Sequence, residues 1–259
     1  MTDAAEATTR DAFLGGRLMI RQPARGYRAG LDPVLLAAAV PARAGDTVLE
    51  LGCGVGVASL CLGARVPGVA LAGLELQPAY AALARENAAA NGIPFEVFEG
   101  DVAAMPKALR MRSFDHVIAN PPWFPRDTSV PAAEAGRETA LGEAVPLAAW
   151  VEAAARRLRP RGRLTLIHRA ERLPDILGAL SGRLGSVELL PLAPRAGRDA
   201  HLVVLRARKD GRAPFRLHAP VVMHEGDRHP GDGEHYTRAI RAVLREGAAL
   251  PFPAGIAKD

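Results

Sequence analysis

The sequence has few cysteines and no long apolar run, and both scarcities narrow what the protein can be. Cys53 and Cys61 are the two cysteines among 259 residues. Their spacing fits no zinc pattern, and two such residues make no disulfide framework. No stretch approaches the ~18 apolar residues of a membrane-spanning helix, and the polar first residues do not resemble a secretory signal. We therefore expect a soluble, cytoplasmic protein with reduced thiols and no membrane partner.

Lysine is also scarce, so arginine carries the charge. The formal net charge is +5, and the sequence holds only three lysines, Lys107, Lys209 and Lys258. Guanidinium groups contact phosphates and stack on bases, so this balance permits a polyanionic partner such as RNA. An arginine bias spread over solvated faces explains the same charge equally well. The candidate RNA-contacting residues are Arg17, Arg21, Arg25, Arg28, Arg126, Arg137, Arg195 and Arg198.

The length and the order of apolar segments fit one α/β domain. A chain of 259 residues with 49% hydrophobic residues can bury a single core with appendages. From residue 46 onward, β-prone runs alternate with helix-like segments, a pattern typical of a parallel sheet. We divide the chain into an N-terminal basic strand segment with a capping helix, residues 1–40, and a main domain, residues 41–259.

The residues that follow the first of these β-prone runs form a glycine-rich loop. Thr47 to Leu51 is apolar, and Gly52, Gly54 and Gly56 follow at alternating positions before a helix-like segment. Glycine permits positive φ and leaves no Cβ between the backbone and a ligand at a helix N-terminus. The third glycine comes one residue too early for a dinucleotide fingerprint. The residues predicted to bind a different cofactor here are Glu50, Gly52, Cys53 and Gly54.

Two acids stand at the ends of the next two predicted strands. Glu75 follows an apolar run about 20 residues after the glycine loop, where nucleotide-binding α/β folds place a carboxylate for ribose hydroxyls. Asp101 follows the next run and is a candidate acceptor for an adenine amine. Their neighbours Leu76 and Val102 are expected at the same site. As structural alternatives, Glu75 is an exposed acid before a helix, and Asp101 is the cap of a helix over residues 102–109.

The most specific motif is the tetrapeptide Asn120-Pro121-Pro122-Trp123, which follows the fourth predicted strand. Two prolines fix φ and remove two N–H donors, so the nearby carbonyl oxygens remain available as acceptors. The Asn120 side chain adds another acceptor, and Trp123 offers a flat face for stacking. Two acceptors can hold both hydrogens of an –NH₂ group and orient its lone pair for attack on a methyl donor. These four residues are the predicted catalytic residues, and the structural alternative is a rigid surface turn.

The motifs together resemble a known family. The segments Gly26 to Asp32, Glu50 to Gly56 and Asn120 to Trp123 are similar to those of the bacterial tRNA adenine-N6 methyltransferases that modify valine tRNA, and so are Trp150 to Leu164 and Gly233 to Thr237. The resemblance implies a Rossmann-like class I methyltransferase that uses S-adenosylmethionine. Its sheet would be mostly parallel and seven-stranded, with one antiparallel strand and helices on both faces.

The resemblance also implies a role for the segment before the glycine loop and a substrate class. Tyr27, Arg28 and Asp32 would close over the methionine end of the cofactor, although Asp32 can equally be a helix cap. The implied substrate is the N6 amine of adenine in tRNA. Two departures bear on the modified base: Trp123 replaces the more usual Tyr, and Asp227 to Gly231 looks inserted.

Other functions fit the same motifs. An Asn-Pro-Pro-aromatic site can hold a protein glutamine amide or the N2 amine of guanine in rRNA, because the geometry at the amine is the same. A binding protein that retains S-adenosylmethionine or RNA affinity without turnover is a further alternative. A loop over Phe124 to Gly142 is a candidate substrate lid. The histidines near the C-terminus fit no standard ligand set, so we expect no metal site.

Overall fold

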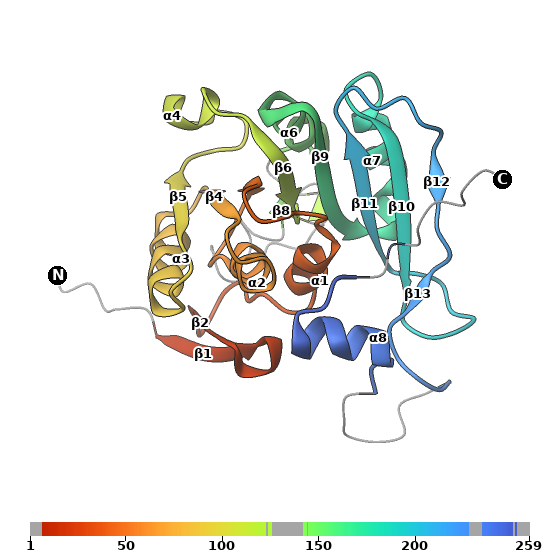
Figure 1. The fold of residues 1–259 in the computed structure, drawn as a ribbon, viewed down its shortest axis with the longest axis horizontal. Coiled ribbons are helices and arrows are strands. Elements are labelled where there is room, and N and C mark those ends of the chain that lie inside the picture. The colour runs from red at the N-terminus through yellow and green to blue at the C-terminus, as the bar shows by residue number, and fades with distance from the viewer. Residues whose placement is uncertain are drawn as a thin grey trace.

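The strands and helices alternate along the chain as the sequence predicts. A computed structural model describes residues 7–122, 124–125, 142–143, 145–227, 235–250 and 252. The sheet order is β12-β10-β11-β9-β6-β3-β4-β5, and β13 also pairs with β10 (Figure 1). The strands of this sheet are β3 (Thr47–Leu51), β4 (Ala70–Glu75), β5 (Phe95–Glu99), β6 (Phe114–Ala119), β9 (Leu158–Arg169), β10 (Gly185–Ala193), β11 (Leu202–Arg208), β12 (Arg216–Leu217) and β13 (Val221–Val222).

The long strands of this sheet are parallel except for one. The pairs β3–β4, β4–β5, β3–β6 and β6–β9 are parallel, whereas β11 runs antiparallel to both β9 and β10. Two-residue strands β12 and β13 extend the edge beyond β10. The expected fold class is confirmed, with seven long strands and one of them reversed.

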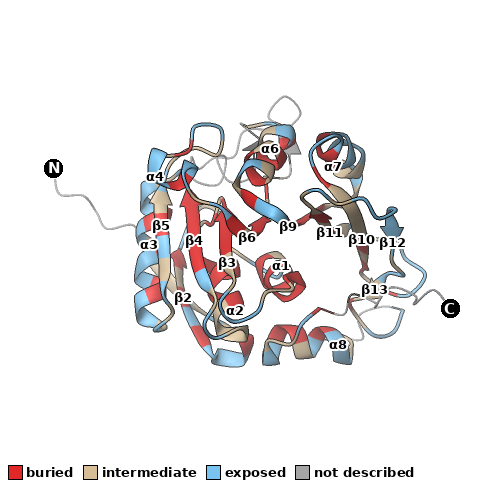
Figure 2. Ribbon diagram, turned by 45° about the horizontal axis from the view of Figure 1, so that its top comes forward, coloured by how far each residue is buried: buried red, intermediate tan, exposed pale blue. Residues whose placement is uncertain are grey.

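Helices cover both faces of the sheet because side chains alternate between faces along each strand. Ile118 of β6 packs in the cluster with α1 and α2, whereas its neighbours Val117 and Ala119 pack with α6 and α7 on the other face. Figure 2 shows that β3, β4 and β6 are largely buried. The helices are α1 (Asp32–Ala39), α2 (Val57–Arg65), α3 (Pro78–Ala90), α4 (Lys107–Arg110), α6 (Leu147–Arg157), α7 (Leu173–Leu180), α8 (Arg238–Arg241) and the short helices η1 (Leu14–Gly16), η3 (Ala170–Arg172) and η4 (Ala242–Glu246).

An N-terminal hairpin, β1 (Thr8–Phe13) with β2 (Leu18–Pro23), lies against α3. The side chain of Asn87 accepts from the Arg21 N–H at 2.8 Å and donates to its carbonyl at 3.0 Å. Asn91 makes the same pair of bonds with Met19, each at 3.0 Å. Four residues of helix advance about 6.0 Å, and two residues of strand advance about 6.6 Å. The two amides therefore take the place of a neighbouring strand along β2.

The long loop after β6 is only partly described. β7 (Phe124–Pro125) pairs with β8 (Gly142–Glu143), whereas the rest of the candidate lid lies outside the described residues, as does Trp123. Over the described parts of the chain, the structure has no helix with the length and apolar character needed to span a membrane.

Candidate active site

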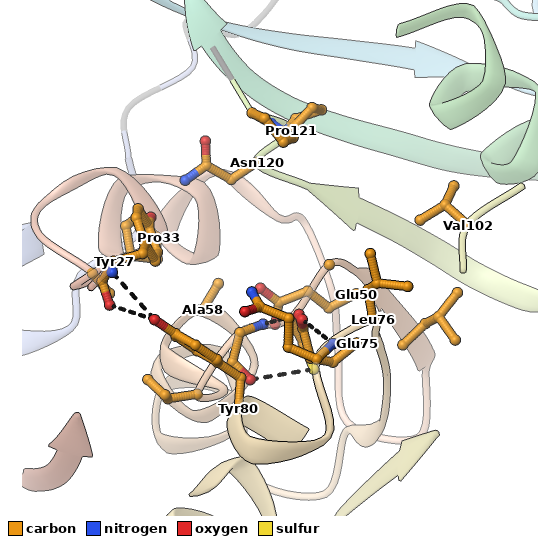
Figure 3. A pocket seen from close by; sticks show the side chains of 18 of the residues that line it. Tyr27, Pro33, Glu50, Ala58, Glu75, Leu76, Tyr80, Val102, Asn120 and Pro121 are labelled. Atoms are coloured by element: carbon orange, nitrogen blue, oxygen red, sulfur yellow. Dashed lines mark hydrogen bonds between the residues drawn. The ribbon is translucent and has the colours of Figure 1, made fainter. Parts of the chain in front are cut away.

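A pocket opens at the carboxyl ends of β3, β4, β5 and β6, the edge where ligands bind in open α/β sheets. Each strand contributes residues from its end or from the loop that follows it (Figure 3). The empty space is about 1030 Å³, open mouth included, which is large enough for a small-molecule ligand. The sequence-predicted residues that line the pocket are Tyr27, Glu50, Gly52, Cys53, Gly54, Glu75, Leu76, Asp101, Val102, Asn120, Pro121 and Pro122.

The glycine loop forms the floor of the pocket. Gly52 has φ of +65°, and a Cβ there would lie 2.7 Å from the ring of Trp150. Gly54 has φ of +54°, and a Cβ there would meet nothing within 4 Å. The first glycine is therefore required by close packing against α6 as well as by its backbone. The second leaves open space beside the backbone in the wall of the pocket, the arrangement predicted for a loop that carries a ligand.

Glu75 is anchored by backbone N–H groups at the end of β4. Its carboxylate accepts from Gly54 at 2.9 Å and from Gln77 at 2.9 Å, one bond to each oxygen. The residue is only 6% exposed, so it is not the solvated acid of the structural alternative. Burial raises the pKa of Glu75, and its backbone hydrogen bonds oppose that rise. A carboxylate has about four acceptor sites, and the backbone N–H groups of Gly54, Leu76 and Gln77 do not fill all of them, so capacity remains for a ribose hydroxyl.

Glu50 lies deeper, where β3 meets the start of α2. Its Oε2 accepts from the backbone N–H of Ser59 at 3.0 Å and from the Ser59 hydroxyl at 2.5 Å. The side chain is 4% exposed. Burial raises the pKa of Glu50 to about 8; the bonds from Ser59 oppose the rise, and the negative charge of Glu75 adds to it. The floor of the pocket therefore holds a carboxyl group that a cationic ligand would help to ionise.

The segment before α1 covers one side of the pocket through Tyr27. The hydroxyl of Tyr80 on α3 accepts from the Tyr27 N–H at 3.2 Å and lies 3.3 Å from the Tyr27 carbonyl, to which it donates. Figure 3 shows this clasp at the pocket wall. Burial raises the pKa of the Tyr27 hydroxyl, with Asp32 and Glu50 contributing.

Arg28 and Asp32 do not line the pocket, in contrast to Tyr27. Arg28 donates to both carboxylate oxygens of Asp11 at 2.8 Å. Asp32 begins α1, which has no side-chain capping bond, and the next residue, Pro33, reaches the pocket wall. Burial raises the pKa of Asp32, while the charge of Arg169 opposes the rise. A direct cofactor role for Arg28 and Asp32 stays a prediction.

Asp101 and Asn120 stand at the carboxyl ends of β5 and β6. Asp101 accepts from the Ala103 N–H at 2.8 Å, so it closes a turn; α4 begins only at Lys107, and the alternative helix over 102–109 does not form. Asn120, Pro121 and Pro122 line the pocket together with the Gly52 and Gly54 loop. The glycine loop and the Asn-Pro-Pro segment, which lie far apart in the sequence, thus share one cavity.

Sequence reasoning missed two aromatic residues of the site. Tyr80 sits on α3 five residues after Glu75, and Trp150 is a buried residue of α6 that packs on Gly52. A sequence signal existed for Tyr80, since aromatics are scarce and this one lies in the first turn of a helix beside the acid. Trp150 could not be placed, because its contact depends on how α6 crosses the sheet.

Among the described residues, no three His, Cys, Asp or Glu side chains are grouped as metal ligands. His218, His224 and His235 are described, whereas His229, Asp232 and Glu234 lie outside the described residues. His224 instead stacks on Tyr236 with ring centroids 4.7 Å apart.

Comparison with known proteins places the chain in a family. Residues 30–191 match the family model described as methyltransferase small domain. The chain belongs to this methyltransferase family. The tRNA1(Val) (adenine(37)-N6)-methyltransferase of Porphyromonas gingivalis W83 is 32% identical over 198 residues, which are 70% of this chain and 76% of that protein. The enzyme of the same name from Dickeya chrysanthemi is 27% identical over 228 residues, 85% of this chain and 87% of that protein.

A solved structure supports the same assignment. The crystal structure of a predicted O-methyltransferase, protein Atu636 from Agrobacterium tumefaciens, superposes with a TM-score of 0.67 at 27% identity. The superposition covers 85% of this chain and 98% of the Agrobacterium protein chain. The expected class I fold, enzymatic class and cofactor are confirmed: the chain is an S-adenosylmethionine-dependent methyltransferase.

The pocket fits that cofactor. The glycine loop gives a wall without side chains at Gly54, and Glu75 retains acceptor capacity for ribose hydroxyls beside it. When bound, S-adenosylmethionine supplies an electrophilic methyl group on a positively charged sulfur. The same cavity holds the buried carboxyl groups of Glu50 and Glu75, whose ionised forms a bound sulfonium would favour.

Four of the six candidate RNA-binding arginines that the structure describes have partners within the methyltransferase itself. Arg17 donates to the carbonyls of Glu246 and Ala64 at 2.9 and 3.1 Å. Arg21 pairs with Glu86 at 2.7 Å. Arg28 pairs with Asp11, and Arg195 donates to the carbonyls of Glu225 and Gly226. Arg25 and Arg198 are exposed, whereas Arg126 and Arg137 lie outside the described residues.

Proposed function

We propose that the methyltransferase modifies the N6 amine of an adenine in tRNA. The observation that carries the proposal is the position of Asn120, Pro121 and Pro122 in the same pocket as the glycine loop and Glu75. Two acceptors that take both hydrogens of an amine suit an –NH₂ group better than a hydroxyl, which has one hydrogen to donate. Support for tRNA comes from the related enzymes of Porphyromonas gingivalis and Dickeya chrysanthemi, whose names specify adenine 37 of tRNA1(Val).

Each half of the pocket has a role in this proposal. One half, which we call the cofactor half, would bind S-adenosylmethionine. There Glu75 would accept hydrogen bonds from the ribose hydroxyls, and Asp101 would accept one from the adenine amine of the cofactor. The other residues of this half are Tyr27, Glu50, Gly52, Cys53, Gly54, Leu76 and Val102. In the acceptor half, the Asn120 side-chain oxygen and a neighbouring proline carbonyl accept the two hydrogens of the substrate amine.

Holding both hydrogens in this way directs the nitrogen lone pair at the methyl carbon. S-adenosylmethionine would supply the methyl group, with S-adenosylhomocysteine as the leaving group, and the amine proton would pass to water once methylation has made the nitrogen acidic. Asn120 and the prolines therefore act by orientation, which requires no general base with a shifted pKa. Trp123, which lies outside the described residues, is proposed to stack on the substrate base.

The direct test uses labelled methyl donor and defined RNA. A valine tRNA transcript should accept label and yield N6-methyladenosine on nucleoside analysis, and the same transcript with guanosine at position 37 should accept none. Label recovered as N2-methylguanosine in rRNA, as a 2′-O-methyl nucleoside or as N-methylglutamine in protein would replace the proposal by the corresponding activity. No label in RNA or protein would favour a binding protein.

The polyanionic partner has its own test. Binding through arginine–phosphate contacts releases counterions, so affinity for tRNA should fall steeply between about 50 and 200 mM salt. A filter-binding or fluorescence titration that shows a salt-independent complex would argue against RNA as the substrate.

A further inference from the structure

The carbonyl group of Pro122 is held by a buried side chain of the neighbouring strand. His168 lies near the end of β9 and is 0% exposed, and its Nε2 lies 3.2 Å from the Pro122 oxygen. The backbone N–H of Arg169 donates to Nδ1 of the same ring at 2.9 Å. Because that N–H can only donate, Nδ1 carries a lone pair and the ring proton resides on Nε2. Nε2 of neutral His168 therefore donates to the Pro122 carbonyl.

The sheet register explains why a side chain is needed at this point. β6 and β9 are parallel, with Ala119 opposite Leu166, and extending that register by two residues brings position 121 level with His168. The prolines at 121 and 122 have no N–H groups, so they cannot donate to β9 as a strand would. The pairing ends at Ala119, and the imidazole N–H supplies a donor beyond that end.

Fixing one carbonyl of this segment fixes the others. A residue that precedes proline is restricted to extended backbone, which applies to both Asn120 and Pro121. Successive carbonyls along such a backbone point in different directions, as in a three-residue polyproline turn. A Pro122 carbonyl directed at β9 therefore sets the rotation of the segment, and with it the directions of the Asn120 side chain and the Pro121 carbonyl in the pocket wall.

We propose that His168 is a positioning residue for methyl transfer, whose Nε2–H holds the Pro122 carbonyl so that the acceptors of Asn120 and Pro121 meet the substrate amine. The inference rests on the proposed amine methylation. His168 does not line the pocket, so it acts through Pro122 and leaves cofactor binding unchanged.

The test compares two replacements of His168 in the full-length enzyme. His168→Leu fills similar space without a donor, whereas His168→Gln retains an N–H near the reach of Nε2. The leucine variant should lower kcat for methyl transfer to tRNA about 10–100-fold, as a small misplacement of reacting groups does, and change the Kd for S-adenosylmethionine less than about twofold. His168→Gln should recover most of the loss. A leucine variant as active as wild type, or a glutamine variant as impaired as leucine, would overturn the proposal.

His116 provides a matched control. It is also a buried histidine, 4% exposed, and its Nε2 lies 3.2 Å from Asp46, near the opposite end of β6. His116→Leu should lower the melting temperature, but it should not cause the selective loss of kcat at unchanged cofactor Kd that is expected for His168→Leu. A kcat loss equal to that of His168→Leu would attribute the effect to general destabilisation and would sink the positioning role.

A spectroscopic readout keeps the inference testable even if the leucine variant does not fold. ¹⁵N NMR of the wild-type imidazole should show His168 protonated at Nε2 and unprotonated at Nδ1, and the opposite tautomer would contradict the assigned bond. Failure of the proposed function is a separate result, because wild-type enzyme would then methylate no amine. Failure of the positioning role instead means an active wild type together with any one of the contradicting outcomes given above for the His168 variants, the His116 control or the tautomer.

Discussion

The two halves of the pocket are built from different chemistry. The cofactor half contains two buried carboxyl groups, Glu50 and Glu75, both bonded to backbone N–H groups. The acceptor half consists of Asn120 and the two prolines, none of which ionises. Under the proposed function, charge serves to bind a cationic cofactor, whereas transfer depends on neutral groups held in fixed directions. Substitutions in the two halves should therefore separate affinity from turnover.

The largest expected effect breaks the acceptor half alone. Asn120→Ala removes a side-chain acceptor of the amine, and loss of one oriented hydrogen-bonding group typically costs about 10²–10³-fold in kcat. Single-turnover methyl transfer to tRNA measures this loss, and calorimetry with S-adenosylhomocysteine should show nearly unchanged affinity. Strongly weakened cofactor binding with preserved turnover would reverse the roles assigned to the two halves.

A pH experiment sharpens the comparison because only the cofactor half titrates. The pKa of Glu50 rises from 4.5 to about 8 on folding, so the folded state keeps a proton that the unfolded state loses. Stability contributed by this proton is full below pH 4.5 and is lost as pH rises toward 8. Because Glu50→Gln cannot ionise, its free energy of unfolding should rise by about 3 kcal/mol relative to that of wild type as the pH increases from 5 to 8.

The measurement is urea denaturation of both proteins, without cofactor, across that pH range. Parallel curves for wild type and Glu50→Gln would show that Glu50 does not hold a proton in the folded state. Asn120→Ala serves as the comparison from the acceptor half, and its free energy of unfolding should show the same pH dependence as that of wild type.

Glu75→Gln should weaken the cofactor half without disabling transfer. One amide oxygen cannot replace both carboxylate oxygens, so either the Gly54 or the Gln77 N–H would face an NH₂ group. That unpaired N–H lowers the stability of the protein with or without cofactor, whereas the affinity falls because a neutral amide replaces a charged acceptor of the ribose hydroxyls. Loss of one hydrogen bond to a charged group costs about 2 kcal/mol, or about 30-fold in affinity for S-adenosylhomocysteine. Glu99→Gln is the control, since Glu99 is an exposed acid on the next strand, paired with Arg85. Equal affinities for the two variants would argue against the ribose role.

The smallest expected effect concerns the clasp over the cofactor. Tyr80→Phe keeps the ring and removes the hydroxyl that bonds both backbone groups of Tyr27. Each such bond contributes about 1 kcal/mol or less, so affinity for S-adenosylhomocysteine should fall about fivefold while kcat at saturation stays the same. A loss of kcat with unchanged affinity would place Tyr80 in the acceptor half.

The sequence predicted those parts of the site whose conformation depends on residues only a few positions apart. The Thr47–Leu51 strand and the glycine turn agree with the structure because apolar runs and glycines act over a few residues. Glu75 and Asn120 could be placed because the carboxyl ends of parallel strands share one edge.

Other features depend on partners distant in sequence and could not be predicted. β1 is polar and half-exposed, and it is a strand because β2 pairs with it. The pairing of Arg28 with Asp11 of that same unrecognised strand could not be predicted either, and the role of Arg28 toward cofactor or RNA stays a prediction. The bond from His168 to Pro122 required the register of β6 against β9.

Asn87 and Asn91 are spaced along α3 as Arg21 and Met19 are spaced along β2, so the two amides together fix the register of the strand against the helix. Sliding the strand by one residue would present the wrong edge to both amides, and a single-residue deletion between Met19 and Arg21 would leave at most one of them paired. Tyr80, whose hydroxyl bonds the backbone of Tyr27, lies on the same helix, so the hairpin and one wall of the pocket share a single support. Insertions and deletions in the hairpin should therefore be tolerated far less well than point changes.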